Sequence, residues 1–172
     1  MTKHFLKLGD LTSVEIESII LDAISRKKKN SYSTELQGKY LALIFEKSST
    51  RTRVSFEVAM SQLGGKASFL SIQDLQLGRG EPIQDTAKVI SSMADAIVLR
   101  TLNHKTITDF AESSSSPIIN GLTDLSHPCQ LLADLLTYTE NRGAIQGKKV
   151  TWIGDCNNMC KTYIEASGLL DF

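Results

Sequence analysis

The sequence predicts an α/β fold in which a parallel sheet carries helices on both faces. Short apolar segments alternate along the chain with segments whose apolar residues recur at helical spacing, and the links between them are short. The run KYLALIF at 39–45 is continuously apolar, as expected of a strand that is buried on both faces. Alternation of this kind is typical of parallel sheets whose strands are joined by right-handed helical crossovers.

The individual elements follow from the same periodicities. Thr12 and Glu15 have the spacing of a capping box, so the first helix is expected to begin there and to end near Asn30. Gly64 and Gly65 end the helix that follows the first strand. Further strands are expected at 66–71, 95–101, 117–120 and 148–155, and further helices at 51–63, 83–94, 104–116, 127–143 and 157–170.

A domain boundary is predicted near residue 142. The segment ENRGAIQGKK is polar and contains two glycines, which is typical of a linker. Residues 1–142 are therefore expected to form one domain. Residues 143–172 read as the first strand–helix unit of a second α/β domain that is incomplete within this chain.

Composition favours a soluble cytoplasmic protein. The formal net charge is zero, so the sequence offers no basic field for nucleic acid. No apolar stretch has the length of a signal peptide or a membrane span, which predicts no membrane association. Three cysteines without a metal-ligand grouping suit a reducing compartment and predict no bound metal.

The segment SSTRTR after the first strand is the strongest candidate site. Ser49, Thr50, Arg51 and Thr52 place hydroxyl and guanidinium donors at the start of a helix, where free N–H groups and the helix dipole favour an anion. The alternative is an ordinary hydroxyl cap followed by surface arginines. The segment lacks the GxxxxGK[ST] pattern of a Walker loop, so spacing alone predicts an oxyanion site of another kind.

Further polar residues are expected at the same edge of the sheet. Arg100 ends an apolar strand and either points into the crevice or is simply solvated. His127 and Gln130 lie three residues apart at a helix start, an arrangement that could bind a carboxamide but is also common on surfaces. Gln76 belongs to a glycine-containing loop that is either functional or an ordinary surface loop.

Taken together, these motifs resemble one enzyme family. The segments FEKSSTRTRVSFE, LGRGEPIQDTA, VLR, NGLTDLSHPCQLLADL and WIGDCNNM occur here in one order. They resemble the aspartate/ornithine carbamoyltransferases, and most closely the ornithine branch. The resemblance covers nearly the whole chain but only about the first half of a family member, namely the carbamoyl-phosphate-binding domain and the beginning of the ornithine-binding domain.

The resemblance implies a role for each candidate residue. Residues 49–52 match the family's phosphate-binding segment, and Arg100 matches an arginine that contacts both phosphate and the carbamoyl oxygen. His127 and Gln130 match the pair that holds the carbamoyl group. Gln76 matches a residue that reaches the carbamoyl phosphate of a neighbouring subunit in a homotrimer.

The resemblance also implies a reaction. The neutral side-chain amine of ornithine would attack carbamoyl phosphate, giving citrulline and phosphate in arginine metabolism, with no metal or cofactor. Arg51, Arg100 and His127 would be the catalytic residues, and Asn158 with the adjacent Asn157 would contact ornithine.

Several alternatives remain open at this point. The family's later HCLP-type and SMG-type motifs have no counterpart in the sequence, so the 172-residue chain alone is expected to be inactive. It could instead act as a carbamoyl-phosphate or phosphate-binding module without turnover. A sister enzyme that uses aspartate or putrescine is a further alternative.

Overall fold

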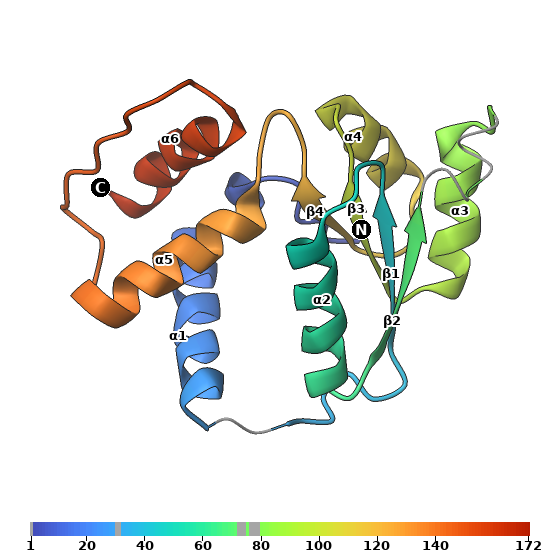
Figure 1. Cartoon of the computed structure of the whole chain (residues 1–172), viewed down its shortest axis with the longest axis horizontal. Coiled ribbons are helices and arrows are strands. Elements are labelled where there is room, and N and C mark those ends of the chain that lie inside the picture. The colour runs from blue at the N-terminus through green and yellow to red at the C-terminus, as the bar shows by residue number, and fades with distance from the viewer. Residues whose placement is uncertain (1, 30–31, 72–74, 76–79) are drawn as a thin grey trace.

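The computed structural model describes residues 2–29, 32–71, 75 and 80–172. Its centre is a four-stranded sheet in the order β2-β1-β3-β4, in which every neighbouring pair of strands is parallel. The strands are β1 (Tyr40–Phe45), β2 (Lys66–Ser71), β3 (Ala96–Arg100) and β4 (Ile118–Leu122). The predicted α/β fold class is therefore confirmed (Figure 1).

Helices cover both faces of this sheet because successive residues of β1 point to opposite sides. Leu43 packs with Met60 of α2 (Thr50–Gln62) on one face. Ile44 packs on the other face in the cluster that contains Ala87 of α3 (Ile83–Met93) and Phe110 of α4 (His104–Ser113). The continuous apolar run of this strand thus fills two separate cores.

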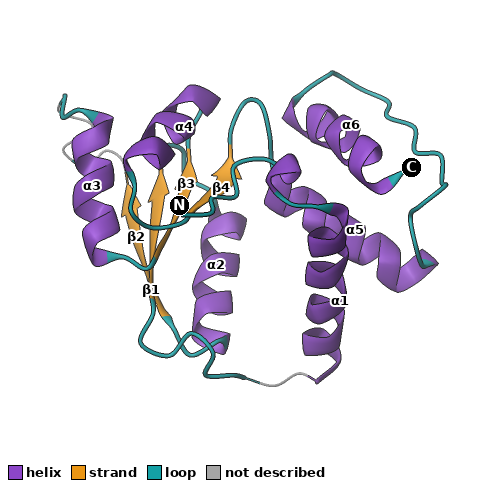
Figure 2. Ribbon diagram, turned by 180° about the vertical axis from the view of Figure 1, so that it is seen from behind, coloured by secondary structure: helices purple, strands orange, loops and turns teal. Residues whose placement is uncertain are grey.

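A third core lies beside β4, where helices pack on one another (Figures 1 and 2). Its buried residues come from the short 3-10 helix η1 and from three α-helices. These elements are η1 (Leu8–Asp10), α1 (Ser13–Lys29), α5 (Pro128–Arg142) and α6 (Asn158–Leu170). Ala166 and Leu170 of α6 are buried in this cluster, so the last helix packs directly on the preceding part of the chain.

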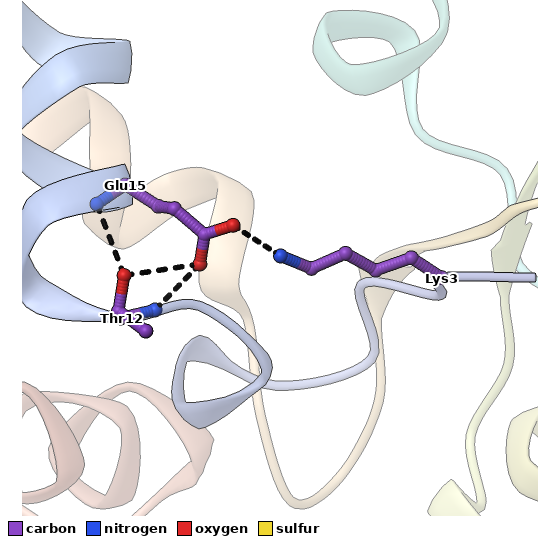
Figure 3. A network of polar contacts seen from close by, with 3 residues as sticks. All are labelled: Lys3, Thr12 and Glu15. Carbon is purple, nitrogen blue, oxygen red and sulfur yellow. Dashed lines mark hydrogen bonds and ion pairs between the residues drawn. The ribbon is translucent and has the colours of Figure 1, made fainter.

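The predicted capping box starts α1. The Glu15 N–H donates to Thr12 Oγ1 at 3.2 Å, and the Thr12 N–H donates to Glu15 Oε2 at 2.8 Å. Figure 3 shows Lys3 on the other side of the same carboxylate, to which it donates a hydrogen bond. The bonds from Lys3 and from the Thr12 backbone lower the pKa of Glu15 to about 2, so the carboxylate stays charged at the helix start.

The strand predicted at 148–155 is wrong. Residues 148–157 are irregular, and no strand within the described residues pairs with them. A strand requires a neighbour to satisfy its N–H and C=O groups, and this segment lies away from the edge of the sheet. Its apolar side chains are accordingly exposed, with Ile153 at 92% and Trp152 at 40%. An apolar pattern is therefore not sufficient for a strand when no neighbouring strand is available to pair with it.

Candidate active site

The carboxyl ends of β1 and β3 bring the segment 49–52 and Arg100 to the same edge of the sheet. Phe45 and Arg100 are paired in register at the last position of each strand. The Glu46 N–H donates to the carbonyl oxygen of Arg100 at 2.8 Å, and the Glu46 carboxylate accepts from the Leu102 N–H at 2.7 Å. These bonds fix the loop that leads from β1 to α2 against the end of β3.

The first turn of α2 leaves its N–H groups available. Ser49 is the N-cap residue, but its side chain accepts no hydrogen bond from the helix. Its hydroxyl instead donates to Thr52 Oγ1 at 3.0 Å. Among the described residues, no group accepts from the N–H of Thr50, Arg51 or Thr52. A helix start with free N–H groups can accept an anion, and no side-chain cap occupies these groups in α2.

The two arginines of this segment differ in their surroundings. Arg53 donates to Glu57 Oε1 at 2.9 Å, and its guanidinium lies 4.2 Å from the centre of the Phe69 ring. Arg53 therefore helps to hold α2 on the sheet. Arg51 is exposed and has no hydrogen bond or ion pair within the described part of the chain. Its guanidinium is free to bind an anion at the helix start.

Arg100 lies between the start of α2 and His127, since it bonds to Thr52 and its charge acts on the His127 imidazole. Its Nη1 donates to Thr52 Oγ1 at 3.3 Å. Its Nε is buried and has no acceptor among the described residues, and burial lowers the pKa of the guanidinium. A buried donor without an acceptor is costly, so this position favours a bound oxygen.

A β-bulge in β4 shapes this end of the sheet. The pairing of β3 with β4 shifts between Leu99 and Arg100, and Gly121 lies opposite the shift. A Cβ on Gly121 would lie 3.0 Å from Val98 Cγ1 and 3.3 Å from Arg100 Cβ. Any other residue here would require Val98 or Arg100 to shift by a few tenths of an ångström, so glycine suits the close approach of the strands beside Arg100. The sequence analysis did not predict the bulge.

His127 is the N-cap residue of α5, and Pro128 lies in the first turn, where a proline is well tolerated. Its N–H donates to Thr162 Oγ1 of α6 at 3.1 Å, which fixes the backbone at this point. Its Nδ1 is buried and has no partner among the described residues. Burial and the positive charge of Arg100 lower the pKa of His127 to about 4, although Asp134 partly opposes them. The imidazole is therefore neutral at pH 7 and can donate from one ring nitrogen.

This depressed pKa predicts acid sensitivity. In the unfolded chain a histidine takes up a proton near its ordinary pKa of 6.5, whereas folded His127 does so only at about 4. Protonation therefore favours the unfolded state as the pH falls from about 6.5 to about 4, and this loss of stability is absent above 6.5. His127→Gln should flatten that part of the stability curve in urea titrations. His4→Gln is the comparison: burial lowers the pKa of His4 as well, although Asp10 opposes this, so the variant should flatten the curve less, and equal flattening by both variants would contradict the assignment.

Gln130 lies one turn further along α5. Its Nε2 donates to Asp134 Oδ1 at 2.9 Å, and the hydroxyl of Tyr163 donates to Asp134 Oδ2 at 3.0 Å. Asp134 lies on the face of His127 and Gln130, where it could either orient a neighbour or be solvated, whereas nothing in the sequence pointed to Tyr163. The spacing of Gln130 and Asp134 was visible in the sequence, but the contact with Tyr163 depends on how α6 packs on α5.

The asparagines predicted to contact ornithine lie at the start of α6. Asn157 is the N-cap, and its Oδ1 accepts from the N–H groups of Met159 and Cys160. The Nδ2 of Asn158 donates to the carbonyl oxygen of Thr123 at 2.8 Å. Both line an open groove of about 600 Å³ whose wall is formed by Leu102, Asn103, Leu122, Thr123, Asp124, Cys156, Asn157, Asn158 and Lys161.

Three further predictions concern Gln76, a bound metal and a membrane span. Gln76 lies outside the described residues. Within the described residues, no three His, Cys, Asp or Glu side chains are grouped as metal ligands would be. None of the helices in the described parts has the length and apolar character needed to cross a bilayer.

Fold and site together define a parallel α/β domain with unpartnered donors at the carboxyl ends of its strands, where ligands bind in sheets of this class. Residues 3–140 match the family model of the aspartate/ornithine carbamoyltransferase carbamoyl-P binding domain. The chain belongs to the aspartate/ornithine carbamoyltransferase family.

Individual relatives agree with this assignment. The chain is 59% identical over 170 residues to an ornithine carbamoyltransferase of Methylococcus capsulatus, covering 99% of this chain and 57% of that protein. The crystal structure of ornithine carbamoyltransferase from Burkholderia thailandensis matches with a TM-score of 0.91 at 50% identity, over 99% of this chain and 60% of that one. The catalytic subunit of M. jannaschii aspartate transcarbamoylase matches with a TM-score of 0.88 at 34% identity, over 99% of this chain and 58% of that one. The chain thus spans somewhat more than half the length of these relatives.

Proposed function

We propose that this chain forms the carbamoyl-phosphate-binding part of an ornithine carbamoyltransferase. The observation that carries the proposal is the convergence of unpartnered donors at one edge of the sheet. Arg51, the Arg100 Nε and the first N–H groups of α2 have no acceptor within the described residues. Arg100 also lies close enough to His127 for its positive charge to lower the pKa of that imidazole, which is neutral at pH 7. A phosphate next to a carbamoyl oxygen would satisfy this set of donors.

The proposed division of labour follows from position. Ser49, Thr50, Arg51 and Thr52, with the N–H groups of α2, bind the phosphate. Arg100 bridges the phosphate and the carbamoyl oxygen, since it lies between Thr52 and His127. His127 donates to the same oxygen, and Gln130 binds the carbamoyl amide. Gln76 is proposed, from family resemblance, to complete the site from a neighbouring subunit of a trimer.

The proposed reaction needs only these donors. The lone pair of the neutral ornithine side-chain amine forms a C–N bond to the carbamoyl carbon, and the carbonyl electrons move to oxygen. Collapse of this tetrahedral intermediate breaks the C–O bond to phosphate, which leaves with the electron pair of that bond and takes up the proton that the amine nitrogen loses. Arg100 and His127 stabilise the oxyanion, and Arg51 stabilises the leaving phosphate. Asn158 and Asn157 would contact the amino-acid end of ornithine in the groove at the start of α6.

The domain division, the oligomeric state and the acceptor are also proposed from the family resemblance. Residues 1–142 are the carbamoyl-phosphate domain, and residues 143–172 begin the ornithine domain, although α6 packs on α1 and α5. The protein is proposed to be a cytoplasmic homotrimer in arginine metabolism. Ornithine is favoured over aspartate as the acceptor, because the ornithine enzymes from Methylococcus and Burkholderia are 50–59% identical to this chain and the M. jannaschii aspartate enzyme is 34% identical.

Radiolabelled carbamoyl phosphate tests the acceptor. The complete protein is incubated with ornithine, putrescine or aspartate, and the labelled products are separated. Label should enter citrulline when ornithine is present, and the other two amines should give little product. Preferential labelling with aspartate or putrescine would assign the chain to a sister enzyme. Tight binding of carbamoyl phosphate without transfer to any acceptor would favour a binding module.

A further inference from the structure

The Asp134 carboxylate is held between two helices. On α5 it accepts from Gln130 Nε2 at 2.9 Å through one oxygen, and from α6 it accepts from the Tyr163 hydroxyl at 3.0 Å through the other. Asp134 is partly buried, and both partners are fixed to elements that pack in the same core. With one partner on each oxygen, the plane of the carboxylate cannot turn freely.

This carboxylate determines which end of the Gln130 amide faces outward. A carboxylate has acceptors only, so the amide must present its NH₂ group to Asp134. The amide oxygen of Gln130 then points away from Asp134. Gln130 itself is exposed, so without this contact its side chain would be free to rotate. The contact converts an amide that could either donate or accept into a directed acceptor.

Contacts from α6 distinguish this arrangement from an ordinary surface pair. A pair at i and i+4 on an exposed helix adds little stability and fixes neither side chain firmly. Here Tyr163 reaches Asp134 from another helix, and its ring packs against Trp152 with centroids 5.9 Å apart. Burial and the negative charge of Asp134 raise the pKa of Tyr163 to about 12, so the hydroxyl remains a donor at neutral pH.

We propose that Asp134 is a positioning residue that turns the Gln130 amide oxygen toward the NH₂ group of the carbamoyl substrate, and so makes the site select a carbamoyl group over an acetyl group. The inference rests on the proposed function and specifies the substrate class of that same site. Carbamoyl phosphate and acetyl phosphate have the same shape and differ by NH₂ against CH₃. A directed acceptor discriminates between them because it is left without a partner when a methyl group faces it.

Two phosphonates that do not transfer their acyl group test this selection. Phosphonoacetamide carries the NH₂ group, and acetonylphosphonate carries CH₃ in its place. In calorimetric titrations the wild-type chain should bind phosphonoacetamide at least about tenfold more tightly. In Asp134→Asn the partner amide can donate as well as accept, so Gln130 can take either orientation. The ratio of the two affinities should fall to within about twofold, while the affinity for inorganic phosphate stays within about twofold of wild type.

Matched variants separate positioning from folding. Tyr163→Phe keeps the ring but removes the hydroxyl, so it should lower the ratio in part even if Asp134→Asn unfolds. Asp109→Asn removes a carboxylate from another i,i+4 pair, with Lys105 on α4, and should leave the ratio unchanged. An unchanged ratio in a folded Asp134→Asn, or in Tyr163→Phe, overturns the inference. A wild-type chain that binds phosphate without preferring the amide also overturns it, whereas a chain that binds none of the three ligands refutes the proposed function itself.

Discussion

Replacing Arg51 with alanine is expected to abolish the stabilisation of this chain by carbamoyl phosphate or inorganic phosphate. Arg51 is the guanidinium of the phosphate segment that makes no hydrogen bond or ion pair within the described residues, so the folded protein does not need it. A ligand at ten times its dissociation constant contributes about 1.4 kcal/mol, which raises the melting temperature of a domain of this size by roughly 3–6 °C. Thermal denaturation with and without each ligand measures the effect.

Arg53→Ala is the matched control, two residues along the same helix. Because Arg53 pairs with Glu57 and lies over the Phe69 ring, its loss should lower the melting temperature of the free protein. The increase on adding ligand should remain. Arg51→Ala should therefore lose the ligand response and keep the stability of the free protein, whereas Arg53→Ala should lose stability and keep the ligand response. A full ligand response in Arg51→Ala would refute the anion site at the start of α2.

Replacing Arg100 with methionine is expected to have two linked consequences. Affinity for carbamoyl phosphate should fall about tenfold to a hundredfold, as hydrogen bonds to charged groups contribute about 1.5–3 kcal/mol. The pKa of His127 should rise, because the positive charge of Arg100 is one of the two causes that hold it at about 4. Calorimetry measures the affinity, and NMR titration of the imidazole measures the pKa.

Lys105→Met provides the comparison for Arg100→Met. Lys105 is a surface cation on α4 that pairs with Asp109, so its removal changes the net charge equally without touching the site. Neither the affinity nor the pKa of His127 should change in this variant. An Arg100 variant with reduced affinity but an unaltered His127 pKa would show that the two side chains do not share one crevice.

Much of the fold could be predicted because its determinants are local. The apolar run of β1 required burial on both faces, and the structure buries Leu43 and Ile44 in separate cores. The capping box of Thr12 and Glu15 is likewise readable from three-residue spacing. The segment 148–155 has an equally strand-like pattern, but a strand also needs a neighbour. Whether a neighbouring strand is present depends on how the whole sheet assembles, so the local pattern gave a wrong strand prediction.

The candidate site was predictable in its residue types but not in its internal division of roles. Spacing alone makes Arg51 and Arg53 equivalent members of one motif, and only the family resemblance singled out Arg51. Only the positions of Glu57 and Phe69 show that Arg53 serves the fold. Tyr163 follows Asp134 by 29 residues, so the hydrogen bond that holds Asp134 beside Gln130 depends on the packing of α6 on α5.

The central claim is that carbamoyl phosphate binds where the strands end, at the start of α2. Backbone amide NMR of the chain, titrated with carbamoyl phosphate, tests this claim most directly. The largest shift changes should fall on Thr50, Arg51 and Thr52, with a second group at His127. The basic run at the end of α1, Arg26 to Lys29, is the other cationic cluster that could attract phosphate. Shift changes confined to that run, with the amides of the α2 start unaffected, would contradict the account.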